Sequence, residues 1–307
     1  PGAQPGDLRP VPLQVRHQGL QRLPGHIGCN SAEHPLHHRG QPPAGRQVRD
    51  LRDGPGGVRT DRVADAGQTN QRKAGEAAAG RGRKMESYRG VSIVYEDNHL
   101  LVVVKPPNMP TQADDSGDAD LHSTMKAYIA ETYQKPGAVY LGLVHRLDRP
   151  VGGLVVLAKT SKAADRLSAQ VRDKTMHRQY VAAVRGDAGE AAELCDFLLK
   201  DGRTNMVRAV PANTPGAKDA KLRYQKCGEA DGLTLVRVRL FTGRSHQIRV
   251  QLSHAGLPIW GDARYGGGKP GEQIALWGAH LGLIHPTKKE EMRFDALPPM
   301  AAQPWKR

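Results

Sequence analysis

Short apolar runs and amphipathic stretches alternate along the chain from Met85 onward, and they predict its first secondary-structure elements. Residues 92–95 and 100–105 have the composition of two short strands, and the Asp and Asn side chains between them favour a turn. Residues 121–133 carry apolar side chains at helical spacing, and Asp120 stands where it can cap that helix. The pattern therefore begins with a hairpin that is followed by a helix.

The rest of the pattern adds more strands and two more helices. Residues 161–174 predict a short amphipathic helix with Ser161 as its cap, and residues 246–256 again show helical spacing. Further strands are predicted on both sides of a polar turn within residues 141–160 and at residues 178–186, 233–242 and 274–286. Strands outnumber helices, and short turns connect them. This predicts an α+β fold with a mixed, mainly antiparallel sheet.

Residues 1–84 differ in composition from the rest of the chain. They contain no Phe, Trp, Tyr or Met and are rich in Gly, Pro, Arg and Gln. Such a segment buries too little apolar surface to offset the entropy lost on ordering it. We therefore expect a disordered or non-native extension over residues 1–84 and one folded domain over residues 85–307. A translation start placed upstream of the true one would produce this pattern, and a disordered RNA-binding arm is the alternative.

The chain is strongly basic in both of these parts. Its net charge is +14, and residues 1–84 contribute half of it, with 14 Lys and Arg against 7 Asp and Glu. A basic surface suits a polyanion such as nucleic acid, because each neutralised phosphate releases counterions. The alternative is a soluble protein that is merely basic.

Cysteine content and hydropathy bear on cellular location and on metal binding. The cysteines Cys29, Cys195 and Cys227 lack zinc-site spacing, and so do the histidines. The number of cysteines is low and odd, which argues against a disulfide framework. No apolar run approaches the ~20 residues that span a bilayer, and the N-terminus lacks the apolar core of a signal peptide. We expect a soluble cytoplasmic monomer that binds no metal and no membrane.

The segment VHRLDRPVGGL, residues 144–154, is the first candidate for chemistry. Its one carboxylate, Asp148, stands among Arg146, Arg149 and His145. Basic neighbours lower the pKa of a carboxyl and keep it ionised, and an ionised carboxylate can act as nucleophile or base at a sugar carbon. The two glycines that follow allow close approach of a ligand to the backbone. The alternative is an Asp–Arg–Pro turn with a surface ion pair.

Residues 241–266 form the second candidate. A strand ends here, and Arg244, Ser245 and His246 open a helix whose free N–H groups can meet an anion. Arg244 and Arg249 can hold phosphates or pair with a carboxylate. The alternative is an ordinary strand, turn and helix with solvated charges.

Tyr180 is the third candidate, in the segment HRQYVAAVRG. Tyr180 stands next to basic residues, and proteins often stack an extruded base on an aromatic ring that has cations beside it. The alternative is a tyrosine of the hydrophobic core, which is the commoner role.

Taken in order, these segments resemble the RluA-type family of RNA pseudouridine synthases, which modify ribosomal and transfer RNA. HRLDRPVGGLVVLAKT matches the catalytic motif of that family, and GRSHQIRVQLSHAGLPIWGDARYG matches its later signature. The resemblance covers about residues 88–300. It implies the family fold, a mixed, mainly antiparallel sheet with a central RNA-binding cleft, and it implies that no cofactor is needed.

The resemblance also implies a role for each candidate residue. Asp148 matches the essential aspartate, and Arg146 matches an arginine that fills the gap left by the flipped base. Tyr180 matches the tyrosine that stacks on the target uracil. Arg244 matches a basic residue that pairs with the catalytic aspartate. One departure is Asn108, which stands where the family has Gly; since Asn tolerates a left-handed conformation, we expect the turn to survive.

The expected function is therefore isomerisation of uridine to pseudouridine in ribosomal or transfer RNA. The enzyme extrudes the uridine, breaks its N1–C1′ bond and rejoins the base through C5. Asp148 either attacks C1′ or removes a proton from C2′. One alternative is a non-catalytic RNA-binding protein or RNA chaperone that uses the same cleft. A second alternative is a glycosidase that acts on nucleosides.

Overall fold

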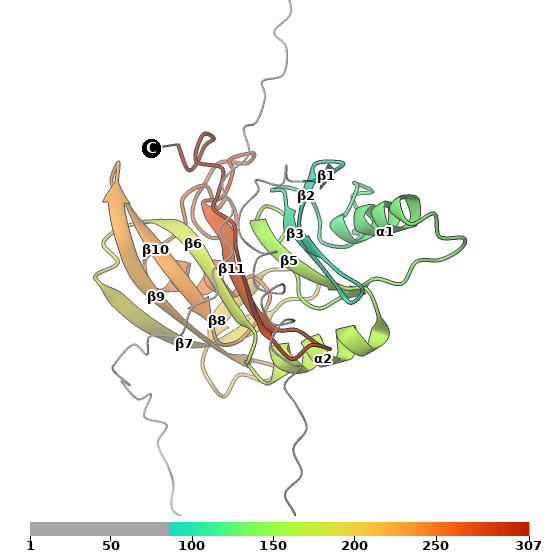
Figure 1. The fold of residues 1–307 in the computed structure, drawn as a ribbon. Coiled ribbons are helices and arrows are strands. Elements are labelled where there is room, and N and C mark those ends of the chain that lie inside the picture. The colour runs from blue at the N-terminus through green and yellow to red at the C-terminus, as the bar shows by residue number, and fades with distance from the viewer. Residues whose placement is uncertain (1–85, 307) are drawn as a thin grey trace, which may run out of the picture. The chain divides into compact units, whose positions relative to one another are not determined.

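The apolar runs of the sequence become strands of one sheet in the computed structural model, which describes residues 86–306 (Figure 1). The strands are β1 (Ser87–Tyr88), β2 (Val91–Glu96), β3 (Leu100–Lys105), β4 (Gly142–Leu143), β5 (Gly152–Ala158), β6 (His177–Arg185), β7 (Ala191–Lys200), β8 (Val207–Val210), β9 (Lys218–Ala230), β10 (Leu233–Leu240), β11 (Leu276–Ile284) and β12 (Glu291–Asp295). The helices are α1 (Leu121–Thr132), α2 (Ser161–Arg172) and α3 (Gln247–His254).

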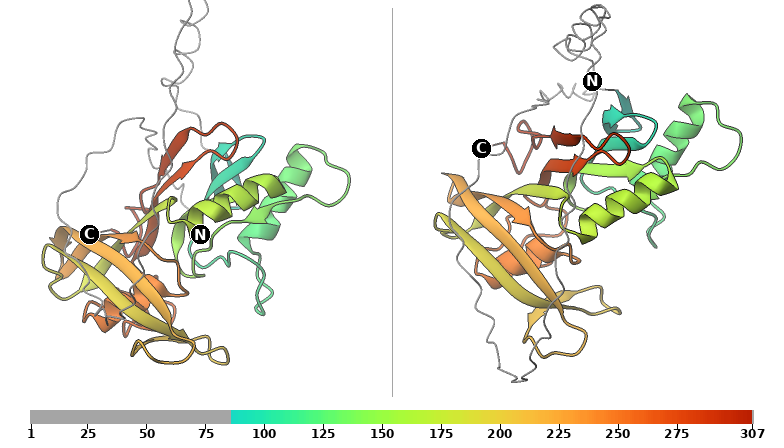
Figure 2. Two further views of the ribbon diagram at one scale, coloured as in Figure 1. Left: turned by 90° about the horizontal axis from the view of Figure 1, so that it is seen from below. Right: turned by 60° about the horizontal axis from the view of Figure 1, so that its bottom comes forward.

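The sheet is mixed and mainly antiparallel, as the sequence predicts. Its strands follow the order β1-β2-β3-β5-β11-β6-β10-β9-β7-β8, with β12 paired to β11 and β4 to β5. Strands β5 and β11 form the parallel pair, in the middle of the order. The strands β6 to β10 therefore lie on the β11 side of this pair, and β1 to β3 with α1 lie on the β5 side (Figures 1 and 2).

Helices cover both faces of the sheet, because alternate residues of each strand point to opposite faces. One face of β3 and β5 packs against α2 through Leu100, Val102, Leu154, Val156, Ala163 and Leu167. The intervening residues of the same strands belong to a second cluster, to which α1 and α3 contribute Leu121, Met125, Ile129, Ile248 and Leu252. None of the helices described is long and apolar enough to cross a membrane.

The contact between β5 and β11 depends on glycine. Gly153 has a φ of +129°, and a Cβ at this position would lie 2.4 Å from the backbone nitrogen and oxygen of Gly278. A Cβ on Gly152 would collide with the ring of Trp277. The sequence suggested that these glycines let a ligand approach, and that interpretation is wrong: they let β11 approach β5. The loop of residues 144–151 is thereby fixed next to the centre of the sheet.

Local signals predict most of the elements correctly. Asp120 caps α1 by accepting the Ser123 N–H, as expected. Asn108 has a φ of +64°, so the turn expected at this departure from the family pattern is present. The cap of α2 is Thr160, not Ser161, since its hydroxyl accepts the Ala163 N–H. The interpretation of residues 1–84 lies outside the described residues.

A half-buried carboxylate holds the turn between β2 and β3. Asp97 accepts the backbone N–H groups of His99 and Leu100, each at 2.8 Å, and a hydrogen bond from the Tyr95 hydroxyl at 2.9 Å. His285, which is fully buried, donates to it from Nε2 at 2.8 Å. Burial alone would raise the pKa of Asp97, but these hydrogen bonds outweigh it and lower the pKa to about 2.

Asp97→Asn is expected to destabilise the fold in a pH-dependent way. A carboxyl with a folded-state pKa below its unfolded value stabilises the fold above the unfolded pKa, and the effect is lost as pH falls through the folded one. The charge-dependent part is about 2 kcal/mol near pH 6 and roughly half of that at pH 3. Urea unfolding of both proteins at the two pH values measures it. A stability difference that stays constant between them would contradict the assignment.

Candidate active site

Asp148 lies in the loop between β4 and β5, with 27% of its side chain exposed. Its backbone C=O accepts the Val151 N–H at 3.0 Å, which closes a turn around Pro150. The preceding residue, Leu147, is fixed by Thr111, whose hydroxyl donates to the Leu147 C=O at 2.7 Å and accepts its N–H at 3.2 Å. The carboxylate is therefore presented to solvent from a backbone that is held on both sides.

Lys105 stabilises this loop, and it was not among the residues predicted from the sequence. Its side chain is fully buried at the end of β3, and Nζ donates to the backbone C=O groups of Pro106, Met109 and Arg149. Burial lowers the pKa of Lys105 to about 7, while the charge of Asp148 acts in the opposite direction. The signal in the sequence was a lysine that ends an apolar run directly before two prolines.

The basic residues next to Asp148 in sequence do not pair with it. Arg149 forms ion pairs with Asp114 and Asp118, and Arg146 donates to a neighbouring glutamine. His145 is buried, and its Nε2 accepts the backbone N–H of Val156. Because burial lowers the pKa of His145 to about 3, its ring carries no charge. The prediction that these neighbours surround the carboxylate with positive charge is wrong.

Asp148 forms an ion pair with Arg249 of α3. Its Nη1 donates to Oδ2 of Asp148 at 3.1 Å, and its Nε and Nη2 donate to both oxygens of Asp262, each at 2.8 Å. Asp262 is 1% exposed. Burial works to raise the pKa of Asp262, but the hydrogen bonds and charge of Arg249 outweigh it and lower the pKa. Of the two roles expected for Arg249, the structure shows the carboxylate pair; contact with RNA stays a prediction.

Arg244 does not pair with Asp148. Its Nη2 donates to Oδ1 of Asp219 at 2.6 Å and its Nε donates to the backbone C=O of the same residue at 2.7 Å. The expected Arg244–Asp148 pair is therefore wrong. Arg244 precedes α3 and faces β9, whereas Arg249 lies among the buried residues of the helix.

Tyr180 and Arg146 occupy contrasting positions near the carboxylate. Tyr180, on β6, is 6% exposed and packs in the cluster shared with α1 and α3. Burial raises the pKa of Tyr180. Tyr180 pairs with Gly278 of β11, and Gly278 pairs with Gly153 of β5, so the residue lies close to the loop that carries Asp148. Arg146 is exposed, and its hydrogen bond to Gln112 is long, at 3.3 Å. The ring is thus fixed, while the guanidinium is held loosely.

His246 and Tyr265 complete the surroundings of Arg249. The Arg249 guanidinium lies 5.1 Å from the centroid of the Tyr265 ring. The Tyr265 hydroxyl lies 2.7 Å from Nδ1 of His246, which is the N-cap of α3. Within residues 86–306, no group of three His, Cys, Asp or Glu side chains is arranged to hold a metal ion.

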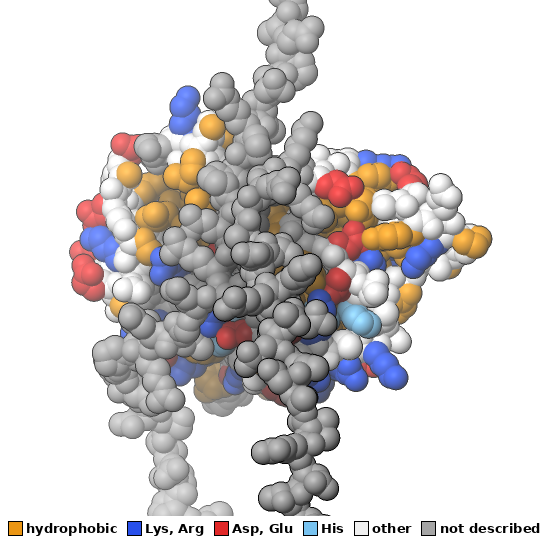
Figure 3. All heavy atoms as spheres, in the orientation of Figure 1, with side chains coloured by type: hydrophobic (Ala, Val, Ile, Leu, Met, Phe, Trp, Pro, Cys, Tyr) orange, Lys and Arg blue, Asp and Glu red, His pale blue; other side chains and the backbone are white. Residues whose placement is uncertain are grey.

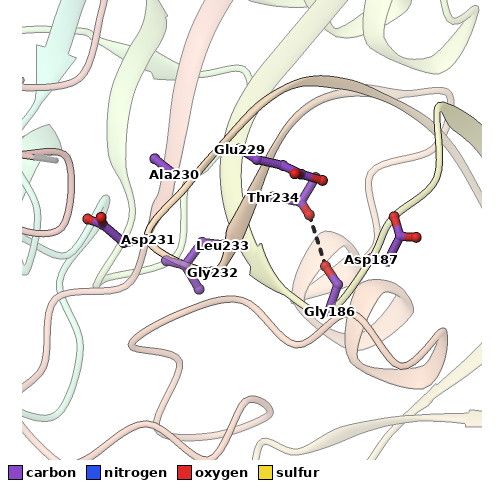
Figure 4. A pocket seen from close by; sticks show the side chains of 8 residues that line it. All are labelled: Gly186, Asp187, Glu229, Ala230, Asp231, Gly232, Leu233 and Thr234. Atoms are coloured by element: carbon purple, nitrogen blue, oxygen red, sulfur yellow. Dashed lines mark hydrogen bonds between the residues drawn. The ribbon is translucent and has the colours of Figure 1, made fainter.

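Charge on the described part of the face seen in Figure 3 is mixed rather than uniformly basic. Figure 3 shows Lys and Arg side chains interspersed with Asp and Glu. A hollow of about 380 Å³ opens where β6 ends and β9 turns into β10 (Figure 4). Asp187, Glu229 and Asp231 line it, together with Gly186, Ala230, Gly232, Leu233 and Thr234. These carboxylates would repel phosphate, and none of the candidate residues lies there.

Comparison with known proteins identifies the family. A family model described as RNA pseudouridylate synthase matches residues 99–254, about half of the chain, including Asp148, Tyr180 and Arg249. Ribosomal large subunit pseudouridine synthase D of Zymomonas mobilis is 34% identical over 225 residues, which are 69% of this chain and 71% of that protein. The chain belongs to the RNA pseudouridine synthase family. Members of this family are isomerases that act on RNA.

Two further comparisons agree with this family membership. A Bacillus subtilis protein named as uncharacterized RNA pseudouridine synthase YjbO is 34% identical over 212 residues, 67% of this chain and 72% of its own. The solved structure of human RNA pseudouridylate synthase domain containing 4 covers 67% of this chain and 88% of its own, with a TM-score of 0.56 and 22% identity. The fold of this synthase is therefore that of the family.

Tyr180 of this synthase offers a test of base stacking. Tyr180→Phe is expected to bind RNA like the parent, because stacking needs the ring, whereas Tyr180→Leu fills the core but cannot stack. The loss for Leu corresponds to ~1–3 kcal/mol for one stacked base. Filter binding, with thermal melting to show that both variants fold, measures the difference. Equal binding by the two variants would leave Tyr180 with a core role alone.

Proposed function

We propose that this synthase isomerises specific uridines of ribosomal or transfer RNA, and that Asp148 is its catalytic residue. The observation that carries the proposal is the geometry of one ion pair: a partly exposed carboxylate is joined to an arginine whose other partner is buried. Arg249 donates to Oδ2 of Asp148 and fixes the direction of this oxygen. Oδ1 has no hydrogen-bond partner among residues 86–306 and is available to the substrate.

A free carboxylate oxygen next to a ribose can act in either of two ways. It can attack C1′ as the N1–C1′ bond breaks, or it can remove a proton from C2′. In both cases the base stays in the site, turns, and forms a new bond through C5, which then loses its hydrogen. The single free carboxylate supports this reaction over hydrolysis, since glycosidases use two carboxyl groups and an activated water. Asp262 does not supply a second group, because it is 1% exposed and bonded to Arg249.

Tyr180 and Arg146 fit the handling of a flipped base. An extruded uracil needs a flat surface to stack on, and the Tyr180 ring is held near Asp148 by the core. The gap that the extruded uracil leaves in the RNA can be filled by a long cationic side chain. Arg146 suits this role, because it is exposed and its hydrogen bond to Gln112 is weak. The names of relatives such as the Zymomonas mobilis protein support ribosomal RNA as the first substrate to test.

The proposal is tested by mapping pseudouridine in ribosomal and transfer RNA from a strain that lacks this gene. We expect one or a few discrete positions to lose the modification. The intact gene should restore them, and a gene that encodes Asp148→Asn should not. An unchanged map in the deletion strain would contradict the proposed substrates, and restoration by the Asp148→Asn gene would contradict the catalytic assignment.

A further inference from the structure

His246 has a backbone conformation that non-glycine residues adopt infrequently. Its φ is +52°, in the left-handed region, and its side chain makes no capping hydrogen bond to α3. The ring instead lies against Tyr265, with the two centroids 5.7 Å apart. A conformation of this kind persists where surrounding structure holds it, and such positions cluster at functional sites. The side chain is therefore aimed by the fold rather than left in solvent.

The hydrogen bonds of Tyr265 favour one tautomer of His246. The Tyr265 hydroxyl oxygen accepts the backbone N–H of Val207 at 3.0 Å. For its own proton, the acceptor within hydrogen-bond distance among residues 86–306 is Nδ1 of His246, 2.7 Å away. With Nδ1 accepting, a neutral imidazole carries its proton on Nε2. Nε2 lies on the opposite side of the ring from Tyr265 and has no partner among residues 86–306.

The charges that act on His246 are those of the active site. Burial lowers its pKa, the charge of Asp148 opposes this, and Arg249, Arg264 and Lys200 lower it further. The ring is therefore neutral, and it lies within electrostatic reach of the catalytic carboxylate. Three cations come from elements next to this ring: Arg249 lies over the Tyr265 ring, Arg264 adjoins Tyr265 in sequence, and Lys200 pairs with Val207, whose N–H the Tyr265 hydroxyl accepts.

Two of these cations are free to bind an anion, and one is not. Arg249 already donates to two carboxylates. Arg264 and Lys200 are exposed, and neither forms an ion pair with any residue of the described part of the chain. Arg264 donates to the backbone C=O of Asn205, which fixes its direction. An N–H donor together with two such cations suits a phosphate group, since phosphate offers several acceptor oxygens and a negative charge.

We propose that Nε2 of His246, with Arg264 and Lys200, binds a backbone phosphate of the RNA next to the target uridine. The inference rests on the proposed function and adds a phosphate-binding subsite to it. A phosphate held here fixes the sugar of the flipped nucleotide relative to Asp148. Tyr265 is a positioning residue, because it acts on the RNA through the tautomer of His246.

An oligouridylate is a suitable probe, since it places a phosphate beside a uracil in every register. His246→Gly removes the ring and suits the left-handed backbone, so the start of α3 is preserved. Gln134→Gly is the matched control, at an exposed left-handed position outside the site. We expect His246→Gly to weaken binding on the order of tenfold, the range for a hydrogen bond to a charged group. Gln134→Gly should bind like the parent.

The salt dependence of binding separates the neutral donor from the cations. Arg264→Gln combined with Lys200→Gln should lower the slope of log K against log salt by about 0.7, the value for one phosphate of a single strand. His246→Gly should leave the slope unchanged, because a neutral group releases no counterion. If the groups share one phosphate, Arg264→Gln combined with His246→Gly should weaken binding by less than the product of the single effects.

Three results would overturn the subsite. His246→Gly could bind like the parent, its effect could multiply independently with that of Arg264→Gln, or its effect could vanish on an abasic oligomer with the same sugar–phosphate chain. The last result would move the contact from phosphate to uracil. All of these measurements are of binding, so they can fail while isomerisation is demonstrated, and they can succeed where the proposed RNA substrates are wrong.

Discussion

Asp148→Asn is expected to abolish detectable pseudouridine formation while the protein stays folded and binds RNA. Asparagine keeps the size of the side chain, and its amide oxygen can still accept from Arg249, so the loop keeps its contact. The negative charge and the basicity of Oδ1 are lost, and neither attack on C1′ nor proton removal at C2′ is then possible. Binding persists because phosphate contacts come from other residues, and it tightens slightly because a negative charge has left the site.

The matched control for this change is Asp219→Asn. Asp219 also pairs with an arginine, Arg244, but it is 65% exposed and lies on β9. We expect this variant to turn over RNA normally. Filter binding, thermal melting and pseudouridine labelling are compared for both variants. Pseudouridine made by Asp148→Asn would remove Asp148 from the mechanism, and unfolding or loss of binding would make it a structural residue.

Arg249→Met is expected to lower both stability and turnover. The arginine side chain is 7% exposed, and its removal leaves Asp262 buried without its cation. Breaking a buried ion pair by removing one partner costs about 3–5 kcal/mol of unfolding free energy. Asp148 also loses the group that orients it, and turnover should fall about 10²–10³-fold, the range for removing one preorganised polar group at an active site. Urea unfolding and single-turnover kinetics measure the two effects.

Two further variants separate the two roles of Arg249. Adding Asp262→Leu to Arg249→Met removes the unpaired buried charge, so stability should recover in large part while turnover stays low. Arg244→Met breaks an exposed pair with Asp219, which contributes about 0–1 kcal/mol, and turnover should stay close to that of the parent. If Arg244→Met lost turnover as severely as Arg249→Met, the ion pair with Arg249 would not explain activity.

The sequence alone predicted the centre of the sheet better than its edge. Strands β3, β5 and β11 are continuous apolar runs because both of their faces are covered, and such runs are easy to recognise. Strands β7 and β9 were missed. Most residues of β7 alternate between exposed and partly buried, and β9 is buried at Ala220, Leu222 and Tyr224 alone. Most side chains of both strands are polar or small, so the two strands resemble loops.

The residues of the sequence singled out Asp148 but left its partner open between Arg244 and Arg249. Asp148 stands in a long motif, whereas its cation lies 101 residues away in sequence. Arg244 and Arg249 are both arginines of the same motif, and the resemblance alone led to the wrong one. Burial decides between them: an arginine among consecutive buried residues of a helix needs carboxylate partners, and the buried Asp262 and the partly exposed Asp148 supply them.

When this synthase forms a new bond at C5 of uridine, the C5 hydrogen is released to water. This release can be measured. Unmodified ribosomal RNA that carries tritium at C5 of uridine is incubated with the purified chain, and tritium in water is measured beside free uracil. We predict tritium release by the parent in proportion to pseudouridine formed, none from Asp148→Asn, and no free uracil. Binding without tritium release would indicate an RNA-binding protein without turnover, and free uracil would indicate a glycosidase; either result would contradict the proposed isomerisation of ribosomal RNA.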